Sequence, residues 1–127
     1  MARILISEPH DDVRRLLERM VTRLGHEPIA IRVPSPRDLT DADVFVVEPV
    51  APLGAVLAQA ACIANPSLPL ICASVTAPPP RLGELGVVFT ASLVKPFTLA
   101  QFGAAIEQAL RAGRAYRGHA RNGHRAA

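Results

Sequence analysis

The sequence is poor in cysteine, aromatic residues and lysine. Its 127 residues include two cysteines, no tryptophan and one lysine, Lys95. Cys62 and Cys72 cannot form a disulfide framework, and neither has histidine or cysteine at zinc-ligand spacing, so we expect a reduced, cytoplasmic setting and no metal centre. The N-terminal run is too short for a signal peptide. No apolar run approaches the ~20 residues of a membrane span, so no membrane partner is expected.

Acidic residues are missing from the last part of the chain. Residues 111–127 contain five arginines and no acidic residue. Because the charge of these five arginines exceeds the net charge of +3 of the whole chain, the first 110 residues carry a net negative charge. A basic tail can attract nucleic acid by releasing counterions. With only one aromatic, Tyr116, for stacking, a solvated tail is the stronger interpretation, and nucleic acid is not the expected partner.

Catalytic motifs are missing as well. The sequence has no GxSxG, GxGxxG or GxxxxGK[ST] pattern, which removes support for hydrolase, Rossmann and P-loop functions. The chain is therefore not expected to be an enzyme.

Short apolar runs alternate with helical patterns over the first 113 residues. Runs typical of buried strands occur at residues 3–7, 27–32, 44–47 and 69–73, and a fifth starts at 87–89 and reaches toward 95–97. This alternation predicts an α/β protein with a doubly wound, five-stranded parallel sheet covered on both faces.

Two amphipathic patterns predict the first and last helices. Apolar residues recur at helical steps from Val13 to Leu24, after Asp11 and Asp12, which we interpret as helix caps rather than metal ligands. Thr98 and Gln101 form a capping box that starts the last helix. Gly113 is expected to end this helix, which makes residues 1–113 the domain and 114–127 a disordered tail.

The other helices are shorter or less polar. Prolines leave room for one helical turn at most in 33–41, and for little helix after Pro78. A third helix is predicted from 53 to 65, within a stretch from Pro49 to Pro80 that has no charged residue. Its expected core face is Leu53, Val56, Leu57, Ala60 and Ala64. The opposite side, with Ala58 and Ala61, is either a harmless alanine surface or a partner or dimer surface.

Polar residues follow the predicted strands. Glu8, Glu48, Ser74 and Lys95 each stand at the carboxyl end of a different apolar run. In open parallel sheets the functional crevice lies at this edge. These four side chains are therefore the candidate site.

The same segments resemble the response-regulator receiver domain, a flavodoxin-like fold. The resemblance covers about residues 2–112 and rests on ILISEPHDD at 4–12, DVFVVEPVAP at 43–52, PLICAS at 69–74 and LVKPF at 93–97. It implies that Glu48 takes the place of the phosphorylated aspartate, and that Glu8 and Pro9 take the places of the acidic pair that binds magnesium. It places the switch hydroxyl on Ser74, the switch aromatic on Ser92 and the phosphoryl-contacting lysine on Lys95.

The resemblance departs from the family pattern where the chemistry is most demanding. Glu48 is one methylene longer than aspartate, which moves its oxygens by roughly 1 to 1.5 Å. Pro9 offers no carboxylate, and magnesium requires near-ideal octahedral oxygen ligands, so magnesium is expected to bind weakly at most. Ser92 has no ring to switch. We expect Glu48 to pair with Lys95, with Glu8 as its rival.

These observations predict a stand-alone, receiver-like module of a phosphorelay with a degenerate phosphorylation site. Such a module would act by binding a sensor kinase or a downstream regulator, and a homodimer is possible. Two alternatives stay open. The same crevice could bind a flavin or nucleotide, or the arginine-rich tail could make the chain a nucleic-acid-associated adaptor.

Overall fold

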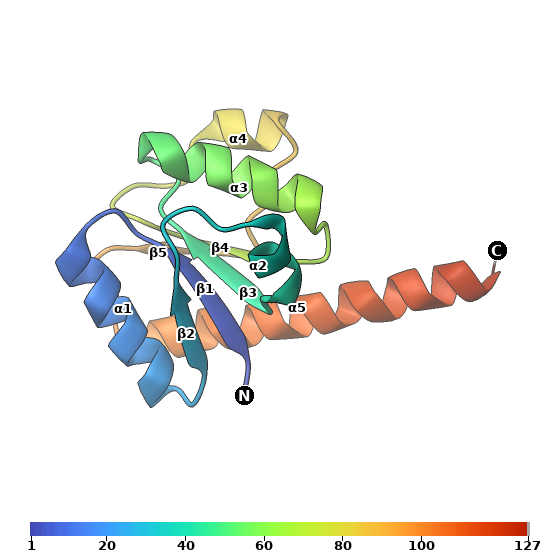
Figure 1. Ribbon diagram of the computed structural model, residues 1–127, viewed down its shortest axis with the longest axis horizontal. Coiled ribbons are helices and arrows are strands. Elements are labelled where there is room, and N and C mark those ends of the chain that lie inside the picture. Colours follow the sequence, from blue (N-terminus) through green and yellow to red (C-terminus); the bar gives the residue numbers. More distant parts are fainter. Residues whose placement is uncertain (127) are drawn as a thin grey trace.

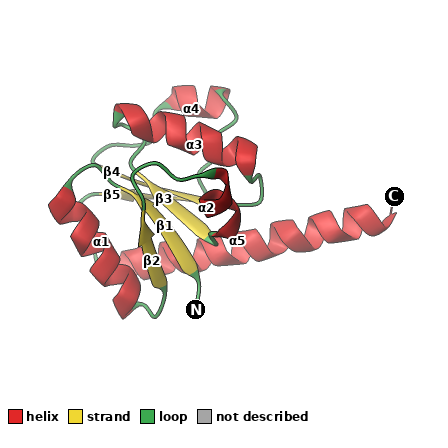
Figure 2. Ribbon diagram, viewed as in Figure 1, coloured by secondary structure: helices red, strands yellow, loops and turns green. Residues whose placement is uncertain are grey.

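The fold is a five-stranded parallel sheet between two layers of helices (Figure 1, Figure 2). The structure is a computed structural model that describes the backbone of residues 1–126 and the side chains of residues 1–118. In chain order the elements are β1 (Arg3–Ser7), α1 (Asp11–Arg23), β2 (Glu27–Ala30), α2 (Pro36–Asp41), β3 (Val44–Val47), α3 (Pro52–Ala64), β4 (Leu70–Ser74), α4 (Pro80–Glu84), β5 (Ala91–Val94) and α5 (Leu99–Ala126). The strand order is β2-β1-β3-β4-β5, so the predicted doubly wound fold is confirmed.

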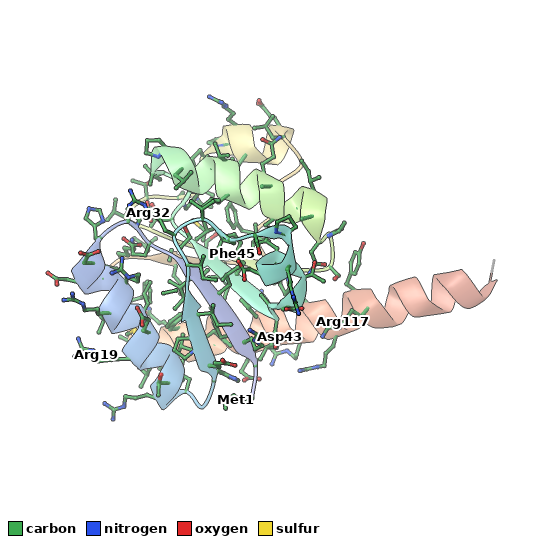
Figure 3. The ribbon with its side chains drawn as sticks, viewed as in Figure 1. Met1, Arg19, Arg32, Asp43, Phe45 and Arg117 are labelled. Carbon is green, nitrogen blue, oxygen red and sulfur yellow. The ribbon has the colours of Figure 1, made fainter. Side chains whose placement is uncertain are left out.

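Each face of the sheet has its own apolar core. On one face, α1 and α5 cover the strands through Leu17, Val21, Phe102 and Ile106. On the other face, α2, α3 and α4 pack over Phe45, which Figure 3 labels in the middle of the molecule. Because both faces are covered, the strands are apolar at nearly every position, as the sequence indicated.

Most helix signals act as expected. Gly25 has φ 85°, the left-handed conformation that ends α1 at low steric cost. The backbone N–H of Gln101 donates to Thr98 Oγ1 and that of Thr98 to Gln101 Oε1, which forms the predicted capping box of α5. At α1 no side chain caps the first turn. Asp11 instead pairs with Arg14, 2.9 Å away, so the predicted capping role was wrong.

Several predicted boundaries shift. β2 ends at Ala30 rather than at residue 32, and β5 begins at Ala91, after the apolar run at 87–89. α4 has only five residues, as the prolines indicated, while α2 has six, slightly more than one turn. The cap of α2 is Ser35, which exchanges hydrogen bonds with Asp38 and lowers the pKa of the Asp38 carboxyl.

The predicted core face of α3 was right only at Leu57; the other four predicted positions, Leu53, Val56, Ala60 and Ala64, are exposed. Gly54, Leu57, Ala58 and Ala61 face the sheet and are buried. The small residues turn inward because they let the helix axis lie close to the sheet. A Cβ built on Gly54 would lie 1.8 Å from the carbonyl oxygen of Glu48, so only glycine fits there.

The last helix is longer than predicted. It does not end at Gly113 but continues to Ala126 and extends past the body of the molecule (Figure 1). A single glycine within a helix costs only about 1 kcal/mol, which its alanine and arginine neighbours can offset. Gly113 also packs closely, since a Cβ there would lie 3.3 Å from Pro69. Residue 127 of the predicted tail lies outside the described residues.

No helix in the described part of the chain is long and apolar enough to cross a membrane.

Candidate functional site

The register of the sheet brings the four predicted site residues to one edge. Ser7 pairs with Val47 across β1 and β3, so Glu8 and Glu48 follow side by side. Ser74 likewise pairs with Val94, which places Lys95 next to Ser74. Backbone hydrogen bonds extend both pairings: the Glu48 N–H donates to the Ser7 carbonyl and the Lys95 N–H to the Ser74 carbonyl. We call Glu8, Glu48, Ser74 and Lys95 the lysine-bridged cluster.

Lys95 connects the two carboxylates. Its Nζ donates to Oε2 of Glu8 at 2.6 Å and to Oε2 of Glu48 at 3.2 Å. The expected Glu48–Lys95 pair is therefore present. Glu8, expected only as a rival, holds the same ammonium at the shorter distance, so one cation serves two anions and the three groups keep a net charge of −1.

The remaining carboxylate oxygens are also occupied. The Ser74 hydroxyl donates to Oε1 of Glu48 at 2.8 Å. Oε1 of Glu8 accepts from the backbone N–H of His10 at 3.3 Å and lies 3.1 Å from His10 Nδ1. All four carboxylate oxygens of the cluster thus have a partner.

These contacts matter for stability because the groups that make them are buried. Glu8, Glu48 and Ser74 are all buried polar residues, while Lys95 reaches them from a partly exposed position. Removing a carboxylate from water is expensive unless it is paired and hydrogen-bonded. Every buried side-chain polar atom in the described residues has such a partner.

The donor set does not fit magnesium, the ion that the receiver resemblance implies. Magnesium requires oxygen ligands in a near-ideal octahedron. Here Lys95 occupies one oxygen of each carboxylate, Ser74 and His10 hold the other two, and Pro9 supplies none. No group of three or more metal-binding side chains occurs in the described part of the chain.

Two predicted positions lie apart from these contacts. Pro9 is exposed and lines a neighbouring cleft. Ser92 is exposed on β5, at the register position opposite Cys72, and makes no hydrogen bond with the cluster.

The cleft beside the cluster has a volume of about 620 Å³. Its apolar walls include Ile31 and Leu53, its floor includes Glu8 and Glu48, and Arg14 and Arg32 line it as well. Figure 3 labels Arg32, which follows β2. The cleft lies where the strand order reverses between β1 and β3, the usual ligand position in doubly wound sheets.

Sequence reasoning missed three residues around the site. His10 is exposed, yet its backbone N–H and its ring Nδ1 both lie within hydrogen-bond distance of Glu8 Oε1. Gly54 sits against the backbone of Glu48 and thereby fixes the β3–α3 loop. Cys72 lies on β4 beside the cluster; burial, helped by the negative charge of Glu48, raises the pKa of its thiol to about 11. Of these three, only Gly54 gave a visible signal, as a glycine in the first turn of the predicted third helix, six residues after Glu48.

The fold belongs to the class of CheY-like receiver folds. The structure is similar to chemotaxis protein CheY4 of Vibrio cholerae, with a TM-score of 0.72 and 20% identity over 87% of this chain and 99% of that one. It is similar to a response regulator receiver domain protein of Clostridium thermocellum, with a TM-score of 0.75 and 15% identity over 91% and 99% of the two chains. A CheY-like receiver domain protein of Methanospirillum hungatei gives a TM-score of 0.75 and 14% identity over 91% and 98%.

Comparison by sequence gives no further relatives. No protein-family model matches the chain, and no curated protein matches it either. The likeness is therefore carried by the fold, and the chain has the fold of CheY-like response-regulator receiver domains.

Proposed function

We propose that the chain is a two-component signalling module that accepts no phosphoryl group and acts through protein–protein binding in one fixed state. The observation that carries this proposal is the lysine bridge: Lys95 Nζ contacts Glu8 and Glu48 together, at 2.6 and 3.2 Å. The receiver fold supports the signalling role, and sensor kinases or downstream regulators are the partners we expect.

Phosphoryl transfer needs a free, well-placed carboxylate oxygen and a cation that neutralises the transferring group. Glu48 offers neither oxygen, since Ser74 holds one and Lys95 the other. Its extra methylene displaces the oxygens, and a misplacement of about 1 Å can lower a rate on the order of a hundredfold. The site therefore does not react with phosphodonors.

The same contacts fix the conformation of the edge. In the receiver resemblance Ser74 is the switch hydroxyl, and here it donates permanently to Glu48. Thr76 follows, with its backbone N–H directed at Ser74 Oγ at 3.4 Å. A partner protein that binds this edge therefore contacts the same arrangement of side chains in every copy of the protein.

Mass spectrometry of the intact protein tests this proposal. After incubation with acetyl phosphate and magnesium, we expect no gain of a phosphoryl group. The double variant Pro9→Asp with Glu48→Asp restores both missing groups and should gain one. A stoichiometric gain in the unmodified chain that disappears in Glu48→Gln would overturn the proposal.

The cleft supports a second candidate function, a small-molecule binder of flavodoxin-like fold. Its apolar residues suit the flat ring of a flavin or nucleotide, and Arg14 and Arg32 are the groups that could pair with its phosphate. Acidic residues line the cleft as well: Glu8, Asp11 and Glu48. Absorbance and mass spectra of the protein as purified test this candidate. A co-purifying flavin or nucleotide supports it, and a ligand-free protein that also binds neither on titration contradicts it.

A further inference from the structure

The outward face of α3 is apolar except for the half-buried Gln59 at its flank. Leu53, Val56 and Ile63 are 43%, 61% and 76% exposed, and the exposed Ala60 lies between them. A surface helix normally turns a polar face to water. Here both faces of α3 are apolar, and only the inner one is covered by the sheet.

Two exposed valines extend this face at its ends. Val50 precedes α3 in the β3–α3 loop and is exposed. Val88 is exposed as well, and its backbone contacts the Cys62 thiol in the last turns of the helix. We define the α3 patch as Val50, Leu53, Val56, Ala60, Ile63 and Val88. α4, which lies beside α3 in Figure 1, belongs to the same side of the sheet.

The charge pattern indicates what covers the patch. No charged residue occurs between Pro49 and Pro80, so α3 and the chain on either side of it are neutral. A charged partner would gain nothing there. A second copy brings the same neutral, apolar surface. The outer side of α1 differs because it carries charges of both signs, on Asp12, Arg15, Glu18 and Arg19.

The spacing of the patch is complementary to itself. Leu53, Val56, Ala60 and Ile63 follow each other at steps of three, four and three residues, the pattern of helix–helix packing. In an antiparallel pair with its two-fold axis beside Ala60, Val56 of one copy meets Ile63 of the other, and the reverse holds too. Such an isologous contact closes on itself, and the small Ala60 allows the helices to approach at the centre.

We propose that the α3 patch is a homodimer interface in which two copies pack α3 against α3, antiparallel. The patch borders the cleft through Leu53, but the proposal makes no use of the chemistry of Lys95. It stands or falls independently of the proposed function.

The size of the patch sets the strength of the dimer. α3 has 13 residues, which at the helical rise is a length of about 20 Å, and a helix face about 10 Å wide gives roughly 200 Å². Stable interfaces bury about 800 Å² per partner. Even with Val50 and Val88 the patch falls short of this area, so the dimer forms and dissociates with concentration.

Analytical ultracentrifugation of the full chain over a wide range of concentrations, up to near-millimolar, tests the interface. We expect a concentration-dependent monomer–dimer equilibrium. Val56→Glu places a carboxylate against Ile63 of the other copy in each of the two symmetric contacts, and the unpaired buried charges should raise the dissociation constant roughly a hundredfold. Ile63→Glu should act in the same direction.

Val94→Glu is the matched control. Val94 is 58% exposed, close to the 61% of Val56, but it lies on β5, away from α3. Since both valines are exposed, both variants should fold, which thermal unfolding verifies. Association that weakens in Val56→Glu and persists in Val94→Glu supports the interface. A wild-type chain that stays monomeric throughout, an unaffected Val56→Glu, or an equal loss in both variants overturns it.

Discussion

Lys95 Nζ lies closer to Glu8 Oε2, at 2.6 Å, than to Glu48 Oε2, at 3.2 Å. The cation that should face a transferred phosphoryl group in a receiver is thus held first by the neighbouring acid. Because Glu8 and Glu48 are both buried, loss of this lysine would leave two carboxylates away from water without their counter-ion, which is costly.

Lys95→Met should destabilise the protein strongly. The substitution leaves two buried carboxylates facing one another, and removing one partner from a buried ion pair costs about 3 kcal/mol or more. Urea unfolding measures the loss. Adding Glu8→Gln to Lys95→Met should recover part of the stability, whereas Arg14→Met, which breaks a surface pair with Asp11, should cost less than about 1 kcal/mol. Equal effects of Lys95→Met and Arg14→Met would contradict the bridging role.

Gly54→Ala should disturb the site by displacing the backbone of Glu48. The added methyl would overlap the Glu48 carbonyl, so the β3–α3 loop must move, at a cost of about 3 kcal/mol. Gly83→Ala is the control, because a Cβ at that helical glycine meets nothing within 4 Å and should be neutral or stabilising. Thermal unfolding of the two variants gives the comparison, and a Gly54→Ala protein as stable as Gly83→Ala would refute the tight approach.

Cys72 should be inert in the native protein and lower stability only in strong base. Its folded pKa of about 11 lies above the ordinary value of 9.0. The unfolded thiol therefore loses its proton first, so this contribution to stability is complete below pH 9 and is lost as pH rises through 11. Iodoacetamide at neutral pH should label Cys72 only after unfolding. Rapid labelling of the native thiol would show that the core around β4 opens.

Residues 114–127 should be dispensable for the domain. Gly113 packs on Pro69, but Arg114, Tyr116 and Arg117 beyond it are exposed. We expect a chain that ends at Gly113 to keep its free energy of unfolding within about 0.5 kcal/mol, while its helical circular dichroism decreases. A truncated chain that unfolds or aggregates would place the domain boundary further along α5.

The sequence predicted the sheet and its edge well because both depend on local patterns. Continuous apolar runs give buried parallel strands, and the residue after each run must lie at the carboxyl edge. This pattern alone selects Glu8, Glu48, Ser74 and Lys95. The contact between Glu8 and Lys95 depends on how far the side chains reach across the two intervening strands, β3 and β4, and the spacing of residues in the sequence does not contain that information.

The orientation of α3 escaped prediction for a physical reason. Ranking residues by hydrophobicity assigned Val56 and Ala60 to the core, but the close approach at Glu48 requires Gly54, Ala58 and Ala61 inside. Where all faces of a helix are apolar, size decides which face packs, and size matters only against a partner surface. The length of α5 was not predicted either. Glycine usually marks the end of a helix, but at Gly113 the packing against Pro69 overrides this local signal.

The central claim is that the lysine-bridged cluster holds one state that phosphodonors do not change. Amide proton–nitrogen spectra of the labelled chain, recorded before and after addition of magnesium and acetyl phosphate, test it most directly. We predict that the signals of Ser74, Thr76 and Lys95 stay in place, while the Pro9→Asp, Glu48→Asp variant shows them moving. Saturable shifts of these signals in the unmodified chain would contradict the claim.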